Sequence, residues 1–321
     1  MRIHLPNSAF LGNIDPFLRS FDTKNEDMLE VTANKKWISI HPVVLAMVAA
    51  IGLTIRPENI RFEKLEARSK HYLERIGLFK LLGLKSDIKI IEHEPAGRFI
   101  PLSKIVDSEE LSRFIADMVP LLHLKPDQAE PIKYIVSELV RNVFEHSCSK
   151  NGAIACAQFY KKSNTIRIGI VDTGIGIKES IDISYKTRSD IEAIKLALTP
   201  GITGTTNKIG GTEFNAGAGL FFIKSIAKVS RDFFVLYSGN AMYKLLKSGA
   251  GKKRTILHID PFKDRHSKSC DLPYWKGVAV GIDISLKQKP EFSQLLDFIT
   301  ETYINAINEQ KKSKYKKAKF I

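Results

Sequence analysis

The sequence has few of the residues that build metal cages or disulfide frameworks. Its 321 residues include three cysteines, Cys148, Cys156 and Cys270, whose spacing fits no metal-binding motif. An odd number of scattered cysteines is typical of proteins kept in a reducing compartment. The first nineteen residues also lack the charged and then apolar pattern of a secretory signal, so we expect a cytoplasmic protein.

Long apolar runs are scarce as well. One stretch, residues 37–55, has no Lys, Arg, Asp or Glu, and its nineteen residues would be long enough to cross a bilayer. Polar residues and a glycine interrupt the stretch, and Pro42 is favourable at the first position of a helix. We therefore expect a short strand at 37–40, a buried helix at about 42–51 and no membrane association.

Acidic residues are outnumbered by basic ones, 35 to 49, which gives a formal net charge of +14. An excess of this size raises the question of anionic partners. Part of it is local, because the last eleven residues carry six lysines and no acid and are too polar to pack. No recognisable nucleic-acid-binding motif is present.

Two common nucleotide motifs are also missing. Gly217-Ala218-Gly219 is followed by Leu-Phe-Phe and not by the third glycine of a dinucleotide fingerprint. Gly251-Lys252 is followed by Lys253, and Leu246 stands where a P-loop has its first glycine. A nucleotide site in this chain would have to be built in another way.

A helix with a polar stripe is the first of three segments that suggest such a site. Residues 128–148 have the apolar period of a helix, and Glu138, Asn142 and Glu145 fall on one stripe at the edge of its apolar face. Amide and phosphate oxygens suit Mg²⁺. The spacing predicts Asn142 as a magnesium ligand, with Glu138 one turn earlier to polarise a water or hydroxyl. The alternative is an ordinary solvated helix face.

A strand that ends in a carboxylate is the second segment. Residues 165–172 alternate, so three isoleucines and Asp172 share one face. A carboxylate in a buried apolar row needs a partner, and the exocyclic amine of adenine would be one. Gly174 and Gly176 follow, and glycine lets the backbone approach a ligand closely. The alternative is a common Asp-Thr-Gly turn.

A glycine-rich helix start is the third segment. Gly217-Ala218-Gly219-Leu220 opens an apolar helix, and unpaired N–H groups at a helix N-terminus favour phosphate. The alternative is a loop that merely begins a helix. Before it, the glycine- and hydroxyl-rich residues 203–211 have the composition of a lid with glycine hinges. Lys208 could reach a phosphate or be solvated.

In this order, the three segments resemble the nucleotide-binding boxes of the GHKL ATPases, the superfamily of gyrase, chaperone, histidine-kinase and mismatch-repair ATPases. The resemblance covers about residues 125–287. It implies ATP and Mg²⁺ as cofactors, Glu138 as general base and a lid at about 178–216. The nucleotide contacts that it implies come from Asn142, which also holds Mg²⁺, and from Asp172, Gly174, Gly176, Ile177, Thr203, Lys208, Gly217, Gly219 and Leu220. One departure is Gly277-Val278, where many relatives have Gly-Thr, which puts a water-linked adenine contact in doubt.

The first segment ends with Glu145-His146, which is most similar to the anti-sigma-factor serine kinases and their standalone relatives. We expect a Mg-ATP-binding regulator that hydrolyses ATP or transfers its γ-phosphate to a protein partner, as an ATPase or a serine/histidine-type protein kinase. One alternative is a nucleotide-sensing interaction module without turnover. The other is a nucleic-acid-associated ATPase. A homodimer is compatible with each of them.

The chain length suggests two domains, both of the α/β class. The resemblance implies a Bergerat-type α/β sandwich over residues 121–290, a mixed sheet with helices on one face. Residues 1–120 are expected to form a small α/β regulatory domain, somewhat similar to STAS domains in layout, with a linker helix near 108–122. Residues 291–321 are expected to form a helix and a lysine-rich tail. The other expected elements are a loose segment at 1–35, strands at 54–62, 88–92 and 254–259, a helix at 65–82 and a long loop at 260–276.

Overall fold

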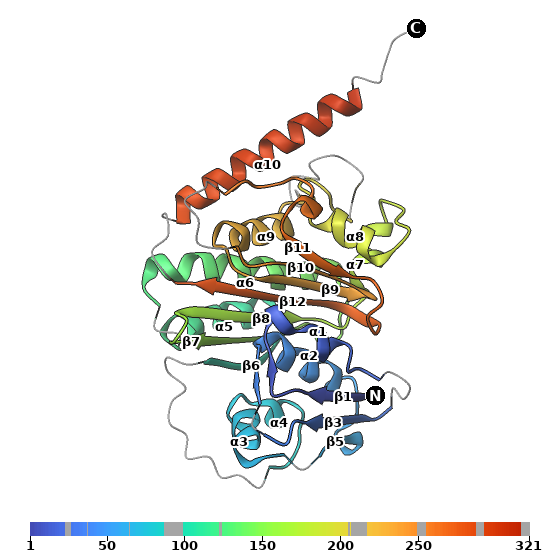
Figure 1. Ribbon diagram of the computed structural model, residues 1–321, viewed down its shortest axis with the longest axis vertical. Coiled ribbons are helices and arrows are strands. Elements are labelled where there is room, and N and C mark those ends of the chain that lie inside the picture. Colours follow the sequence, from blue (N-terminus) through green and yellow to red (C-terminus); the bar gives the residue numbers. More distant parts are fainter. Residues whose placement is uncertain are drawn as a thin grey trace.

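The chain forms a large seven-stranded sheet with helices packed on it, and a smaller three-stranded sheet near the N-terminus (Figure 1). A computed structural model describes residues 1–22, 27–36, 38–63, 65–86, 99–121, 124–204, 206, 217–248, 255–286 and 292–315. The α/β class is confirmed. Within the described residues, no helix has the length and apolar character needed to cross a membrane.

The large sheet has seven strands in the order β11-β10-β9-β12-β8-β7-β6. Their bounds are β6 (Phe99–Ile105), β7 (Ala153–Tyr160), β8 (Thr165–Val171), β9 (Phe234–Gly239), β10 (Ala241–Leu245), β11 (His266–Ser269) and β12 (Trp275–Ser285). Every neighbouring pair is antiparallel. The expectation of a mixed sheet is therefore wrong, because most neighbours are joined by hairpins or by connections that reverse the chain.

One face of this sheet carries a layer of helices. They are α5 (Ser108–Leu121), α6 (Pro126–His146), α7 (Gly176–Asp182), α8 (Asp190–Ala197), α9 (Gly219–Val229) and α10 (Phe292–Tyr315). Apolar residues from these helices and from the sheet share one core, in which Ile135, Ile168 and Phe221 are almost fully buried. The elements expected for the three nucleotide segments thus form as helix, strand and helix around one core.

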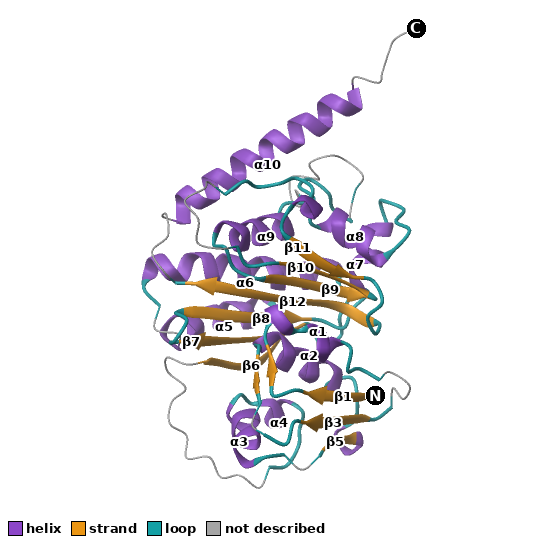
Figure 2. Ribbon diagram, viewed as in Figure 1, coloured by secondary structure: helices purple, strands orange, loops and turns teal. Residues whose placement is uncertain are grey.

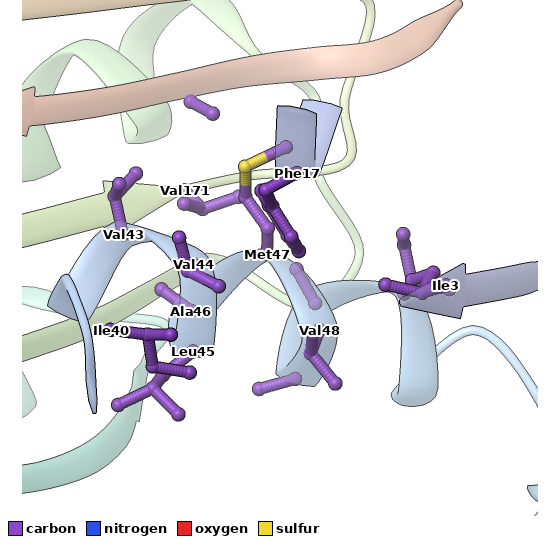
Figure 3. Packing of buried hydrophobic residues seen from close by; sticks show 14 of the residues in the cluster. Ile3, Phe17, Ile40, Val43, Val44, Leu45, Ala46, Met47, Val48 and Val171 are labelled. Carbon is purple, nitrogen blue, oxygen red and sulfur yellow. The ribbon is translucent and has the colours of Figure 1, made fainter. Parts of the chain in front are cut away.

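The opposite face is covered by the N-terminal residues. Their helix α2 (Pro42–Gly52) packs against β7, β8 and β12 and is buried at all eleven positions (Figure 1). Figure 3 shows Met47 of α2 and Phe17 beside Val171 of β8. The helices α6 to α9 share the other face. The uncharged run that could have suggested a membrane span belongs to the N-terminal part, and its burial on this sheet was not expected.

Two glycines make this close contact possible. Gly169 of β8 and Gly281 of β12 are partners in the strand register. A Cβ atom at Gly169 would overlap the backbone of Val43, and one at Gly281 would lie 2.7 Å from Leu11 Cδ2. The missing side chains leave the space that the start of α2 occupies.

The first 35 residues are not loosely structured, contrary to expectation. They form β1 (Arg2–Leu5), β2 (Ser8–Ala9), α1 (Asp15–Leu18) and β3 (Leu29–Ala33). The strands β1 and β3 pair in parallel, and β5 (Ile60–Phe62) joins them in a three-stranded sheet, shown beside the large sheet in Figure 2. Ile3, Leu5 and Leu29 are fully buried. The strands β1 and β3 alternate apolar and polar residues over only four and five positions, which resembles a polar loop in the sequence.

Further expectations for the N-terminal part need correction. The short strand β4 (Ser39–Ile40) and helix α2 form as expected, but of the strand expected at 54–62 only β5 forms. The helix expected at 65–82 is divided into α3 (Ala67–Arg75) and α4 (Leu78–Leu81), because Gly77 between them has a φ of +81°. The strand expected at 88–92 lies outside the described residues.

The strand expected at 254–259 is absent from its described part, residues 255–259. β11 pairs with β10 instead, from within the segment expected to be a loop. The sequence did not predict β11 because it is an edge strand of polar residues, without the apolar alternation that marks a strand.

The division of the chain near residues 120 and 290 stays a prediction, as does the likeness of the N-terminal part to STAS domains. The large sheet includes β6, which precedes residue 121 and pairs with β7. Helix α5, most of which also precedes residue 121, belongs to the helical layer and packs on β6 and α6.

Candidate functional site

The three nucleotide segments meet at one cavity on the helical side of the sheet. Its volume of about 120 Å³ is several times the ~10–15 Å³ that one water molecule needs. Eight of the predicted residues line it: Asn142, Asp172, Gly176, Ile177, Thr203, Gly217, Gly219 and Leu220. Apolar walls come from Ile170, Ile181, Val278 and Val280, among others. The arrangement can enclose a flat apolar ring with polar groups at its edges.

Asp172 lies at the end of β8 and is 2% exposed. The backbone N–H of Gly174 donates to its Oδ1 at 2.7 Å. Burial raises the pKa of this carboxyl to about 7, although hydrogen bonds from the backbone lower it. A buried carboxyl in a cavity can accept a hydrogen bond from an amine of a ligand.

Gly174 serves packing and does not line the cavity. A Cβ atom there would overlap the carbonyl oxygen of Ser147, which also accepts a hydrogen bond from Ile175 N at 2.8 Å. The turn after β8 is thereby held against the end of α6, and Asp172 is brought beside the polar stripe of that helix.

A buried serine that the sequence reasoning missed fixes the next turn. Ser238 of β9 accepts from Ile177 N at 2.9 Å and donates to the Gly277 carbonyl at 2.7 Å. Asp172 N donates to the carbonyl of Val278 at 2.9 Å, and the Val278 side chain lines the cavity. The only signal in the sequence was a hydroxyl at the end of an apolar strand.

Asn142 and Glu138 face the start of α9. A Cβ atom on Gly219 would lie 2.9 Å from Glu138 Oε2 and 3.5 Å from Asn142 Nδ2. A side chain at residue 219 would therefore fill the space between the two helices. Asn142 Nδ2 is buried and has no hydrogen-bond partner within the described part of the chain. A buried donor without a partner is costly, and a ligand in the cavity would satisfy it.

Glu138 is paired with a residue of its own helix. Its Oε1 lies 2.6 Å from Arg141 Nη2, and its side chain is 18% exposed. Burial raises the pKa of Glu138, Arg141 lowers it and Glu145 raises it. Lys208, which the sequence suggested as a phosphate contact, lies outside the described residues.

His146 is a second residue whose role the sequence did not predict. It lines the cavity and lies 3.7 Å from Glu145, Nε2 to Oε2. Burial lowers the pKa of this imidazole, although Glu145 raises it. At neutral pH the ring is uncharged and offers one donor and one acceptor. Its position at the last residue of α6 was visible as part of the Glu-His pair.

The predicted lid contains a fixed part. Its helices α7 and α8 bury Ile181, Ala193 and Ile194 in the core, so residues 178–198 belong to the body of the molecule. Gly201 N donates to the Gly217 carbonyl at 3.0 Å, which ties together the two ends of the following excursion. Residues 205 and 207–216 lie outside the described residues, and a lid there stays a prediction.

The fit of a magnesium ion rests on Asn142. The described residues contain no group of three or more His, Cys, Asp or Glu side chains that could hold a metal by themselves. Magnesium usually keeps several waters and takes substrate phosphates as ligands. The Asn142 amide oxygen beside Gly219 is compatible with that kind of site.

No protein-family model matches the sequence, and a search of curated proteins found no match either.

Proposed function

We propose that this chain is a Mg-ATP-binding regulator of the GHKL type, with a Bergerat-type nucleotide domain. The observation that carries the proposal is the meeting of Asp172, Asn142 and Gly219 around one cavity, although they come from three separate segments. Asp172 supplies a buried acceptor to the cavity, and the unpartnered amide of Asn142 lies beside Gly219 at the N-terminus of α9. A purine with a phosphate chain has the matching donor and charges.

Each residue has a role in that proposal. Asp172 accepts a hydrogen bond from the exocyclic amine of adenine, between the apolar walls made by Ile170 and Val278. The first turn of α9, beginning at Gly219, offers N–H groups to the phosphates. Asn142 holds Mg²⁺ with its amide oxygen. Magnesium, when bound, offsets the charge of the phosphates.

Glu138 is proposed as the general base. It accepts a proton from water or from the hydroxyl of a protein partner as that oxygen attacks the γ-phosphate. The pKa of Glu138 is raised by burial, which makes it a better proton acceptor than an exposed glutamate. The products are ADP and either inorganic phosphate or a phosphorylated regulatory protein. A homodimer is part of the same proposal.

A second candidate is a nucleotide-sensing module without turnover. The contact of 2.6 Å between Glu138 and Arg141 favours it, because a carboxylate engaged by a guanidinium is a weaker base. In that case ATP would bind and change the conformation of the lid without being consumed.

Calorimetric titration of Mg-ATP into the full chain tests the proposal. We expect binding by wild type, loss of binding in Asp172→Asn and unchanged binding in Asp117→Asn, which changes an exposed aspartate of α5 as a matched control. Circular dichroism would establish that all three proteins are folded. Near-native affinity in folded Asp172→Asn, or no binding by wild type, would contradict the proposal.

A further inference from the structure

Much of the positive charge of the chain is concentrated in one part of it. Residues 217–286 contain twelve Lys and Arg against five Asp and no Glu. This part contributes half of the formal net charge of +14, and it is separate from the lysines of the C-terminal tail. None of these cations is among the residues that line the nucleotide cavity.

Three of the five acids of this part are buried, whereas several of its cations are exposed. Asp232 is 1% exposed and Asp264 is 4% exposed. In contrast, Lys263, Arg265 and Lys268 are exposed, and the Lys247 side chain is 53% exposed. We call these four residues the basic face. Acids lie close to these cations: the buried Asp232 is 3.8 Å from Lys247 Nζ, and the partly exposed Asp260 pairs with Lys195. The four cations still outnumber the exposed acids of this face.

The four residues belong to one edge of the large sheet. β11 is the last strand beside β10, and Leu246 N donates to the Arg265 carbonyl at 2.9 Å. Arg265 Nη1 donates to the Lys247 carbonyl at 3.4 Å. Figure 1 shows β11 at the edge of the sheet that lies opposite β6. Arg265 and Lys247 are thus neighbours in space, and Lys268 lies further along the same edge strand.

Stacked rings make this edge rigid. Tyr243, Phe262 and His266 stack with centroid distances of 5.2 to 6.3 Å and interplanar angles of 12 to 17°. Lys268 Nζ lies 4.6 Å from the centre of the Phe262 ring. Cations held on such a platform lose less freedom when they bind than lysines on a free tail.

A buried ion cluster fixes the platform to α9. Asp264 Oδ2 accepts from Lys224 Nζ at 2.8 Å, and its Oδ1 lies 3.3 Å from Lys228 Nζ and 3.1 Å from His258 Nδ1. Lys224 is 1% exposed. The basic face is therefore attached to the helix whose first residue, Gly219, lines the nucleotide cavity.

We propose that the basic face binds the phosphate backbone of a nucleic acid. A short row of cations on a rigid edge matches a chain of regularly spaced phosphates, and such contacts carry affinity without reading sequence. An anionic membrane is the less suitable partner. Insertion requires a broad apolar face, whereas the exposed large apolar side chains in the described part of residues 217–286 are only Ile256, at 67%, and Tyr274, at 57%.

Fluorescence anisotropy with a labelled 20-nucleotide RNA and a 20-base-pair DNA, each without ATP, tests this proposal. The test variant is Lys263→Glu/Arg265→Glu/Lys268→Glu in the full chain. The control is Arg61→Glu/Lys161→Glu/Lys162→Glu, which reverses the same number of exposed charges on other elements. Both variants keep the lysine tail. Thermal melting checks that each is folded, and a Gln version of the test variant replaces the Glu version if it is not.

The expected result is specific for the basic face. The slope of log affinity against log salt should fall by about 2–3 in the test variant, since each phosphate contact contributes about 0.7–0.9. The control variant should keep the wild-type slope. Equal losses in both variants, no binding by wild type, or tighter binding to phosphatidylserine vesicles than to either nucleic acid would overturn the proposal. Because ATP is absent, the outcome is independent of the proposed nucleotide function.

Discussion

The two faces of the seven-stranded sheet differ in how completely they are packed. On the face that meets α2, glycines at 169 and 281 admit the helix so closely that one added methyl group would overlap it. On the helical face, α6, α7 and α9 leave a cavity next to the same strand, β8. Neighbouring residues of one strand thus serve a dense contact and an open site.

The polar groups of the two faces differ in the same way. On the α2 side, His41 is fully buried but its Nε2 lies 3.2 Å from Asp283 Oδ1, and its Nδ1 accepts from Val43 N at 3.1 Å. On the cavity side, Asp172 has a raised pKa and Asn142 Nδ2 has no partner within the described residues. Burial with partners stabilises a contact between parts of a protein. A buried donor without a partner that lies at a cavity, such as Asn142 Nδ2, indicates where a ligand can bind.

Removing the proposed base should produce the largest change and should affect the cavity face alone. Glu138→Ala is expected to lower ATP turnover or phosphotransfer by about 10²–10⁴, with Mg-ATP affinity roughly unchanged. A coupled-enzyme assay and calorimetry measure the two quantities. Glu109→Ala, at an exposed glutamate of α5, is the control. Equal turnover in wild type and Glu138→Ala would favour the sensing module.

Adding a methyl group to the opposite face should affect stability alone. Gly169→Ala is expected to lower the free energy of unfolding by about 1–3 kcal/mol, because its Cβ would overlap the Val43 backbone. Gly12→Ala should be milder, since its Cβ would meet the tip of the Phe233 ring at 3.2 Å, which can shift. Urea denaturation compares the two. If both variants lose the same free energy of unfolding, the contact of Gly169 with α2 is no tighter than the contact of Gly12 with Phe233.

Asn142→Ala should separate the metal contact from the rest of the nucleotide site. We expect the affinity for ATP with Mg²⁺ to fall by roughly 10–100-fold, by analogy with the loss of groups that support a bound metal. The affinity for metal-free ATP should change much less. Titrations with Mg²⁺ and with EDTA give the two values, and equal losses would show that Asn142 does not act through the metal.

The pKa of Asp172 predicts how pH affects the cavity face. The folded-state pKa of about 7 lies above the ordinary value of 3.8, so the folded state binds more protons than the unfolded state between these values. This carboxyl therefore makes the protein less stable as pH rises from about 4 to 7, and the effect levels off above that. Asp172→Asn removes it. The melting temperature of Asp172→Asn minus that of wild type should grow between pH 4 and 7; a constant difference would contradict the raised pKa.

Much of the cavity could be predicted from the sequence because its chemistry requires particular residue types at short spacings. Asn142 follows Glu138 by one helical turn, and Asp172 ends an apolar strand. The contact between the N-terminal part and the sheet could not be predicted, since it depends on pairings between distant segments that leave no local pattern. Gly169 and Gly281 look like weak strand residues until the helix that covers them is known.

The smallest expected effect concerns Arg141, which pairs with Glu138 three residues before it on α6. Arg141 lowers the pKa of Glu138, so Arg141→Ala should raise that pKa and move the acidic limb of the rate against pH to higher values. Turnover should then fall on the acidic side of the profile and match wild type at high pH. Arg141→Lys should restore most of the lost rate.

A role of Arg141 in binding phosphate would give a different pattern. The KM for ATP would then rise in Arg141→Ala, and the acidic limb would stay in place. Arg113→Ala, at an exposed arginine of α5 that lies 3.9 Å from Glu109 four residues before it, should change neither. The position of the acidic limb and the KM for ATP therefore decide whether Arg141 tunes the base or contacts the nucleotide. If neither quantity changes in Arg141→Ala, the 2.6 Å pair is a surface contact without effect on the cavity.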